Sequence, residues 1–246
     1  MQKIILLLVV GLIGCQPEQH PKAVEIVDAS IKAHGQSALM ESKMSFTFRD
    51  KQYSSERTKE GYIYKRKFAN SSGTIEDILI NGTDFVRLLN NDTTELSTKK
   101  INAYKNSVNS VLYFTQLPYL LNDQAVIKSY KGSQQIGDAE YNVIKVTFKS
   151  ENGGEDFDDE YRYWIDKETY LVDYFAYSYH TDEAGVRFRE AYNRSEKGGI
   201  IFQDYVNYEV AVGTPLSKIP SLFEAGKLKE LSRIENTDIS VIRLKK

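Results

Sequence analysis

The chain lacks two features that define large classes of protein: paired cysteines and an excess of basic residues. It carries 1 cysteine in 246 residues, so an internal disulfide is excluded. Its 32 basic and 34 acidic side chains almost balance, which leaves no basic field for nucleic-acid phosphates. Aromatic residues, by contrast, are plentiful: 11 Phe, 17 Tyr and 1 Trp, within 41% hydrophobic residues, are too many for a disordered chain. These numbers predict one globular domain that does not bind nucleic acid.

The longest apolar run is too short to cross a membrane as a helix. It covers residues 4–13, follows a short basic start and ends at Gly14-Cys15. A spanning helix needs about 20 apolar residues, whereas a run of this length fits the centre of a secretory signal. Leu12-Ile13-Gly14-Cys15 resembles a bacterial lipobox, in which a cysteine after a small residue is acylated before cleavage. We therefore predict a signal peptide over residues 1–14 and lipidation of Cys15.

The lipobox also predicts where the protein lies. Residues 15–21 contain two prolines and read as a tether, and residues 22–246 form a single domain. Several acyl chains at Cys15 would hold the domain stably at a membrane surface. Gln16 replaces the Asp that retains many lipoproteins at the inner membrane. We expect a monomeric, lipid-anchored protein of the cell envelope, at the outer membrane and facing the periplasm.

Two segments have the apolar spacing of amphipathic helices. They cover residues 22–34 and 102–116, and in both the apolar side chains recur every three or four residues. Gly35 follows the first segment and suits the left-handed conformation that ends a helix, while Pro118 stops the second. The sequence therefore predicts an N-terminal helix and a helix inserted in the middle of the chain.

The remaining segments alternate as strands do, and Asn81-Gly82 is a strong hairpin signal between two of them. We expect a short helical turn at residues 220–225 and strands at residues 45–53, 61–68, 78–80, 85–89, 125–130, 141–148, 161–165, 171–179, 186–192, 200–210 and 239–244. Strands in hairpin order predict a mainly β, α+β fold, with one large curved antiparallel sheet and helices against it. Alternation alone leaves a closed barrel, a sandwich and an open half-barrel as possible forms.

A resemblance to a known family favours the open form. Trp164-Ile165-Asp166 before an Asp-Lys turn resembles a hairpin of the periplasmic lipoprotein-carrier superfamily, the LolA/LolB-like fold. Residues 137–146 are similar to the strand that precedes it, and the first helix leads into Phe46-Thr47-Phe48 as in that group. The resemblance implies an open half-barrel, with both helices on its concave face and an apolar cavity that holds acyl chains or a lipoprotein.

The sequence contains no motif of a known catalytic or metal site. Gly-x-Ser-x-Gly, a phosphate-binding glycine loop and closely spaced His or Cys ligands are all missing. The acidic run at residues 155–160 misses the spacing of a calcium loop, and Lys65-Arg66-Lys67 reads as a solvated strand edge. We expect a protein that is not an enzyme and has no cofactor, no catalytic residues and no metal.

Aromatic strand residues are the best candidates for a ligand site. Aromatic side chains pack sheets in most proteins, but a set of them pointing inward would line an apolar cavity. The predicted lining set is Phe46, Phe48, Tyr62, Tyr64, Trp164, Phe188 and Phe202. Two other functions stay open: a scaffold module that binds another envelope protein, and a hydrolase that uses His180 or a carboxylate pair.

Overall fold

The protein is built from antiparallel strands with a few helices, in a computed structural model that describes residues 21–149, 159–180 and 184–244. The helices are α1 (Pro21–Ala33), α2 (Thr98–Thr115) and α3 (Ile219–Glu224), with short 3-10 turns η1 (Gln36–Leu39), η2 (Tyr119–Asn122) and η4 (Leu216–Lys218). The strands are β1 (Ser42–Phe48), β2 (Lys51–Arg57), β3 (Tyr62–Asn70), β4 (Gly73–Ile80), β5 (Asp84–Leu89), β6 (Asp92–Thr93), β7 (Val126–Ile136), β8 (Ala139–Phe148), β9 (Glu160–Asp166), β10 (Val172–Tyr179), β11 (Gly185–Lys197), β12 (Ile200–Val210), β13 (Lys229–Ile234) and β14 (Asn236–Arg243).

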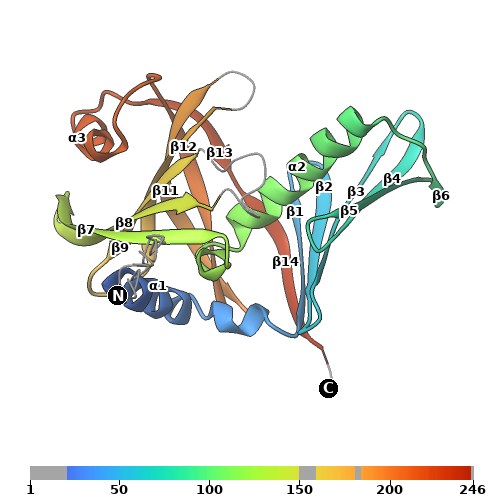
Figure 1. The fold of residues 1–246 in the computed structure, drawn as a ribbon, viewed down its shortest axis with the longest axis horizontal. Coiled ribbons are helices and arrows are strands. Elements are labelled where there is room, and N and C mark those ends of the chain that lie inside the picture. Colours follow the sequence, from blue (N-terminus) through green and yellow to red (C-terminus); the bar gives the residue numbers. More distant parts are fainter. Residues whose placement is uncertain (1–20, 150–158, 181–183, 245–246) are drawn as a thin grey trace, which may run out of the picture.

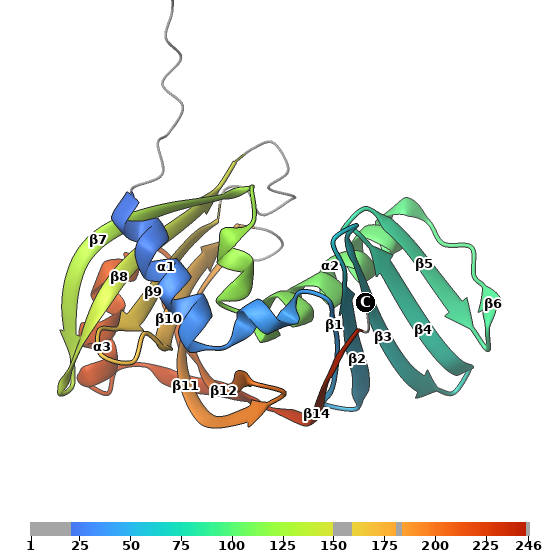
Figure 2. The same ribbon diagram turned by 90° about the horizontal axis from the view of Figure 1, so that it is seen from below.

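The strands form two open sheets of seven strands each. The first sheet has the order β14-β1-β2-β3-β4-β5-β6, and the second has the order β13-β12-β11-β10-β9-β8-β7. Figure 1 shows the two sheets side by side, with α2 running between them, and Figure 2 shows α1 lying across the second sheet. The predicted fold class, an open and mainly β antiparallel architecture with two helices on its inner side, is confirmed.

The expected sheet is divided in two at one point of the chain. β13 and β14 are separated only by Glu235, so one extended segment runs along both sheets (Figure 1). Its first half pairs with β12 and its second half pairs with β1. Because the segment changes its partner strand at Glu235, the ladder is interrupted there, and the two halves of the architecture separate around α2.

α1 ends where the sequence predicts, and its last residues fix it to the second sheet. Gly35 has φ 67°, and a Cβ at this position would collide with the carbonyl oxygen of Gly199. The backbone N–H of Ile201 donates to the carbonyl of His34 at 2.9 Å. Only glycine tolerates both the positive φ and the close contact with the Gly199 backbone. Gly35 is therefore needed for the end of α1 to pack against β12.

α2 packs on the inner face of the first sheet. Val108 and Leu112, both fully buried, belong to one apolar cluster with Tyr64 and Leu79 of β3 and β4. The helix begins four residues earlier than the apolar spacing indicates, because its first residues, Thr98 to Lys100, are polar and exposed and so show no apolar spacing. It ends at Thr115, before Pro118, as expected.

The hairpin predicted at Asn81-Gly82 is confirmed, whereas one predicted strand is wrong. Asn81 and Gly82 have φ 49° and 75°, and together with Thr83 they form the loop between Ile80 and Asp84, which pair across β4 and β5. Residues 45–53 form parts of two strands, β1 and β2, that reverse at Arg49-Asp50. Arg49 takes the left-handed conformation, φ 55°, although Asn or Gly usually occupies such a position, so this turn was not predicted.

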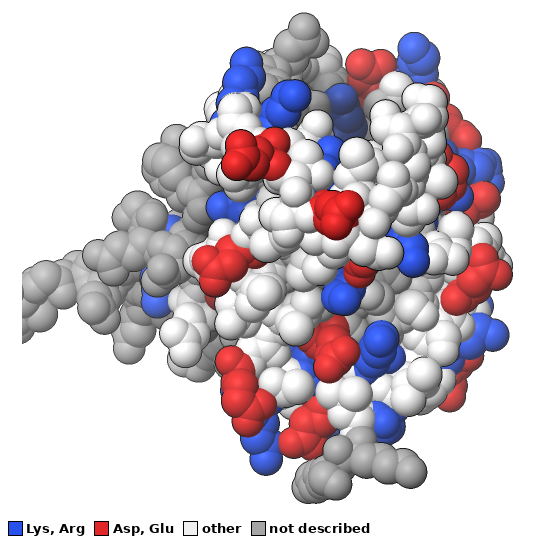
Figure 3. All heavy atoms as spheres, turned by 90° about the vertical axis from the view of Figure 1, so that its right-hand side faces the viewer, with Lys and Arg blue, Asp and Glu red and all other residues white. Residues whose placement is uncertain are grey.

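The surface reflects the balanced charge of the chain. Figure 3 shows acidic and basic side chains interspersed on the side of the molecule formed by the first sheet. Within the described ranges, none of the helices is both apolar enough and long enough to cross a membrane.

Candidate ligand cavity

A cavity of about 350 Å³ lies between α2 and the second sheet. α2 forms one wall, β9 to β12 form the opposite wall, and the end of β1 and the β13–β14 junction close the side toward the first sheet. Six of the thirteen lining residues are aromatic. The cavity is lined by Phe48, Ser110, Val111, Phe114, Thr115, Asp159, Tyr161, Tyr177, Tyr179, Arg189, Tyr205, Ile234 and Asn236.

The aromatic wall is held by ring contacts that cross from sheet to helix. Tyr161 and Tyr177 are neighbours across β9 and β10, and their rings stack at 5.2 Å. Phe114 of α2 stacks on Phe175 at 5.7 Å and contacts Tyr177 at 5.5 Å. Burial raises the pKa of Tyr205, so its hydroxyl stays neutral at the end of this wall. These contacts hold the aromatic wall of the cavity in place. The cavity volume lies within the range found for small-molecule sites.

Two charged residues also line the cavity, at different places along the strands. Arg189 is 7% exposed, and its Nη2 donates to the Tyr177 hydroxyl at 3.0 Å. Asp159, which directly precedes β9, is 3% exposed, and its Oδ1 lies 3.7 Å from Nδ1 of the exposed His180. An apolar cavity with a few fixed polar groups is the usual form of a site for an amphiphilic ligand.

The structure does not bring the predicted lining residues together in one site. Phe48 lines the cavity, and Phe46, Tyr64 and Phe202 are buried in the cluster beneath α2, with Tyr62 packed against it. Trp164 and Phe188 are fully buried on the other face of the second sheet, in a cluster that also includes residues of η4 and α3.

Strand alternation contained part of the missing information. It places Tyr161 and Tyr163 on the face opposite Trp164, but it does not say which face turns toward the helices. In the structure the tyrosine face is the inner one, and Trp164 donates from Nε1 to Gln134 at 2.9 Å on the other side. Arg189 and Phe114 carried no sequence signal, because the cavity forms only when α2 packs over the sheet.

A second hollow, of about 510 Å³, has a different character. It lies between α1 and η2 and contains the carboxylates of two aspartates and the guanidinium of Arg57. Its lining residues are Asp28, Ile31, Ser37, Arg57, Tyr119, Leu120, Asn122 and Asp123. This polar lining suits water better than a hydrocarbon chain.

Other residues singled out in the sequence lie apart from the cavity or outside the described chain. Cys15, the rest of residues 1–20 and residues 155–158 of the acidic run are not described, so the signal peptide, lipidation and tether stay predictions. Glu160 pairs with Lys145 at 2.6 Å and with Arg162 at 3.4 Å. In the parts of the chain that the structure describes, no group of three His, Cys, Asp or Glu could hold a metal ion.

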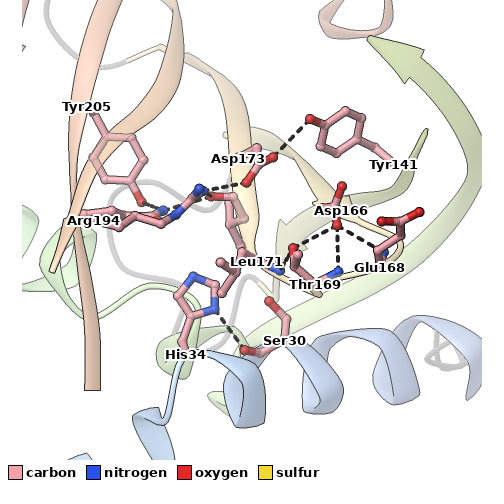
Figure 4. A network of polar contacts seen from close by, with 12 residues as sticks. Ser30, His34, Tyr141, Asp166, Glu168, Thr169, Leu171, Asp173, Arg194 and Tyr205 are labelled. Carbon is pink, nitrogen blue, oxygen red and sulfur yellow. Dashed lines mark hydrogen bonds and ion pairs between the residues drawn. The ribbon is translucent and has the colours of Figure 1, made fainter. Parts of the chain in front are cut away.

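A polar network lies beneath the end of α1 (Figure 4). Arg194 pairs with Asp173, and the Tyr141 hydroxyl donates to the same carboxylate at 3.0 Å. Nδ1 of His34 lies 2.9 Å from the carbonyl oxygen of Ser30, so the ring caps its own helix. Burial lowers the pKa of His34 to about 4, and the backbone hydrogen bond only partly opposes this effect.

Acidification should destabilise the protein through His34. The unfolded chain binds this proton with the ordinary pKa of 6.5, whereas the folded protein binds it only near pKa 4. Stability is therefore complete above pH 6.5 and falls as the pH decreases toward 4, by about 3 kcal/mol for a fully buried ring.

Urea unfolding at several pH values measures this effect. Compared with His34→Asn, the wild-type protein should lose more unfolding free energy between neutral pH and pH 4. The carboxylates titrate in both proteins, so the difference isolates His34. Parallel pH profiles for the two proteins would contradict the prediction.

Comparison of the sequence with models of known protein families identifies one family. Residues 2–236 match DUF6503, a family of unknown function. The chain belongs to this family. Among curated proteins, no sequence matches this DUF6503 protein.

Solved structures show the fold that this DUF6503 protein adopts. A LolA superfamily protein from Nitrosomonas europaea is similar with TM-score 0.52 at 10% identity, over 89% of this chain and 92% of that one. A DUF1329 family protein from Desulfovibrio piger has TM-score 0.47 at 10% identity, over 89% and 92%. A putative outer membrane lipoprotein-sorting protein domain from Vibrio parahaemolyticus has TM-score 0.34 at 9% identity, over 75% and 86%. The Nitrosomonas structure confirms the resemblance to the LolA/LolB-like fold.

Proposed function

We propose that this protein binds an acyl chain, or another hydrophobic group, in the cavity between α2 and the second sheet. The observation that carries the proposal is the cavity itself, about 350 Å³ in volume and with six aromatic residues in its lining. Hydrocarbon moved from water into such a site gains about 25 cal/mol for each Å² of apolar surface that is buried. The confirmed LolA-like fold supports the proposal, since the resemblance implies carriers of acyl chains.

The protein would act as an anchored carrier and not as an enzyme. Acyl chains on Cys15 would hold the domain at the envelope, with the outer membrane favoured by Gln16, and a monomer would receive lipids or lipoproteins there. This part of the proposal rests on the lipobox and on the absence of a catalytic motif from the sequence.

Binding of a dansyl-labelled fatty-acid probe tests the proposal. The protein used is the chain from residue 15 onward with Cys15→Ala, which keeps every described helix and strand but carries no acyl group. We expect saturable probe fluorescence that unlabelled fatty acid displaces. A protein that binds no probe, and from which lipid extraction and native mass spectrometry recover no amphiphile, would favour the scaffold function instead.

A bulky residue at the cavity rim should block this binding. Ser110 of α2 lines the cavity and is exposed, so an indole placed there has room to cover the opening without disturbing the core. Ser110→Trp should weaken probe binding roughly tenfold or more, the loss of at least 1.4 kcal/mol. Asn109→Trp is the matched control, because Asn109 is the exposed preceding residue of the same helix and does not line the cavity. Equal probe affinities of the two variants would place the ligand elsewhere.

A further inference from the structure

Arg189 is a buried cation whose contacts inside the protein are almost all aromatic. Its guanidinium carbon lies 4.1 Å from the ring centre of Phe114, 5.3 Å from that of Phe175 and 5.4 Å from that of Tyr177. The ring faces attract the cation but do not neutralise it. The guanidinium of Arg189 therefore places a positive charge at the wall of the cavity.

The hydrogen-bonding capacity of this guanidinium is not used up. Among the residues that the structure describes, its recorded hydrogen-bond partner is the Tyr177 hydroxyl, and Nε is buried without one. No described carboxylate lies within ion-pair distance of it. Two other arginines show the contrast: Arg66, equally buried, pairs with Asp77 at 2.6 Å, and Arg194 pairs with Asp173.

Asp159, the acidic residue of the cavity, lies too far from Arg189 along the strands to be its ion-pair partner. In the register of the second sheet, Arg189 lies beside Phe175, and Phe175 lies beside Tyr163. Asp159 precedes Tyr163 by four residues, which is about 13 Å along a strand. Its carboxylate faces His180 at 3.7 Å instead. The two charges therefore mark different places in the cavity.

We infer that the ligand is an acyl chain with an anionic head group, and that Arg189 binds the head group inside the cavity. The inference rests on the proposed function and adds the chemical class of the ligand. A carboxylate or phosphate oxygen accepts from the guanidinium nitrogens that face the cavity, while the hydrocarbon lies against the rings of Phe114, Tyr161 and Tyr177. A charge-assisted hydrogen bond shielded from water gives such a ligand a large advantage over a neutral amphiphile of equal length.

Calorimetric titration of the chain from residue 15 onward, with Cys15→Ala, tests this inference with three ligands of the same chain length. They are decanoate, decyl phosphate and decanol, at about pH 8, where the carboxyl group is ionised. The protein should bind at least one anion roughly 10- to 100-fold more tightly than decanol. Tighter binding of decanoate would indicate a free fatty acid, and tighter binding of decyl phosphate would indicate a phospholipid head group.

Variants locate the preference at Arg189. Arg189→Met keeps the long apolar side chain and removes the charge, so the two anions should lose their advantage and bind no more tightly than decanol. Arg187→Met is the matched control, since Arg187 lies two residues away on β11, stacks over Tyr179 at 5.4 Å and does not line the cavity. The control should keep the wild-type preference.

The outcomes separate the two proposals. Binding of all three ligands with equal affinity would overturn the role of Arg189 and leave the acyl-binding function standing. A preference that survives in Arg189→Met would overturn it as well. Failure of every ligand to bind would overturn the proposed function itself. If Arg189→Met does not fold, the unsubstituted protein still tests the ligand class: equal affinities for the anions and decanol would overturn the inference, and tighter binding of an anion would support it.

Discussion

Replacing Asp77 by alanine should lower the free energy of unfolding by about 3–5 kcal/mol, the cost of removing one partner from a buried ion pair. The Asp77 carboxylate is fully buried and accepts from Nε and Nη2 of Arg66, at 2.9 and 2.6 Å, and from Nε of Arg87 at 2.6 Å. Without it, two guanidinium groups would face each other inside the protein.

The same cluster ties the inserted helix to the first sheet. Nη1 of Arg66 donates to Ser107 of α2 at 2.7 Å, and the guanidinium of Arg87 lies 3.5 Å from the ring centre of Tyr104 on the same helix. Loss of Asp77 would release both arginines from these positions. The cavity wall formed by α2 would then loosen, so the variant should also bind the fatty-acid probe more weakly.

Chemical denaturation measures the stability effect, with Glu76→Ala as the matched control. Glu76 is the neighbouring residue of β4 and pairs with Lys65 at 3.3 Å near the surface. An exposed pair of this kind contributes about 0–1 kcal/mol. Asp77→Asn, which keeps the shape and one acceptor oxygen, should fall between the two alanine variants. A loss in Asp77→Ala no larger than in Glu76→Ala would show that the cluster does not hold the sheet.

Replacing Cys15 by alanine should remove the protein from the membrane fraction of cells. Each CH₂ buried in lipid contributes about 0.8 kcal/mol, so several acyl chains bind essentially all of the protein, and their loss releases it. Labelling with radioactive palmitate and fractionation of the cells measure both effects. Labelled acyl groups on Cys15→Ala would contradict lipidation at this residue.

Gln16→Asp serves as the control for this experiment. It leaves Cys15 in place, so palmitate labelling should continue at the wild-type level. In the sorting rule that the lipobox comparison implies, an Asp at this position retains the protein at the inner membrane. Fractionation of the two membranes would therefore detect a change of place without a change of lipidation.

The elements of the fold were largely predictable, because they depend on local patterns. Apolar spacing, Gly35 and Pro118 predicted the two main helices, and Asn81-Gly82 predicted a hairpin at the correct residues. The strand at residues 229–234 was missed, since Lys229–Ile234 is mostly exposed at a sheet edge and shows little apolar alternation. Edge strands are held by pairing with their neighbour, a property of the partner as much as of the segment.

The environment of charged residues was predicted poorly. Arg66 reads as part of a solvated basic run, yet it is buried, because the register places it opposite Asp77, and Asp77 opposite Arg87, in one row across three strands. Residues ten or more positions apart come into contact only when each strand takes its correct register. If a strand shifted its register by one residue, all of its side chains would move to the other face of the sheet.

The sequence by itself determined the class of architecture, the two helices and the predicted export and lipidation of the chain, because each depends on residues near one another. Only the tertiary structure decided which face of the second sheet is the inner one and what lies on it. Phe114 of α2 meets Phe175, Tyr177 and Arg189 because the helix crosses between two sheets that separate at Glu235. The cavity and its buried cation arise from that packing, and no local pattern in the sequence records it.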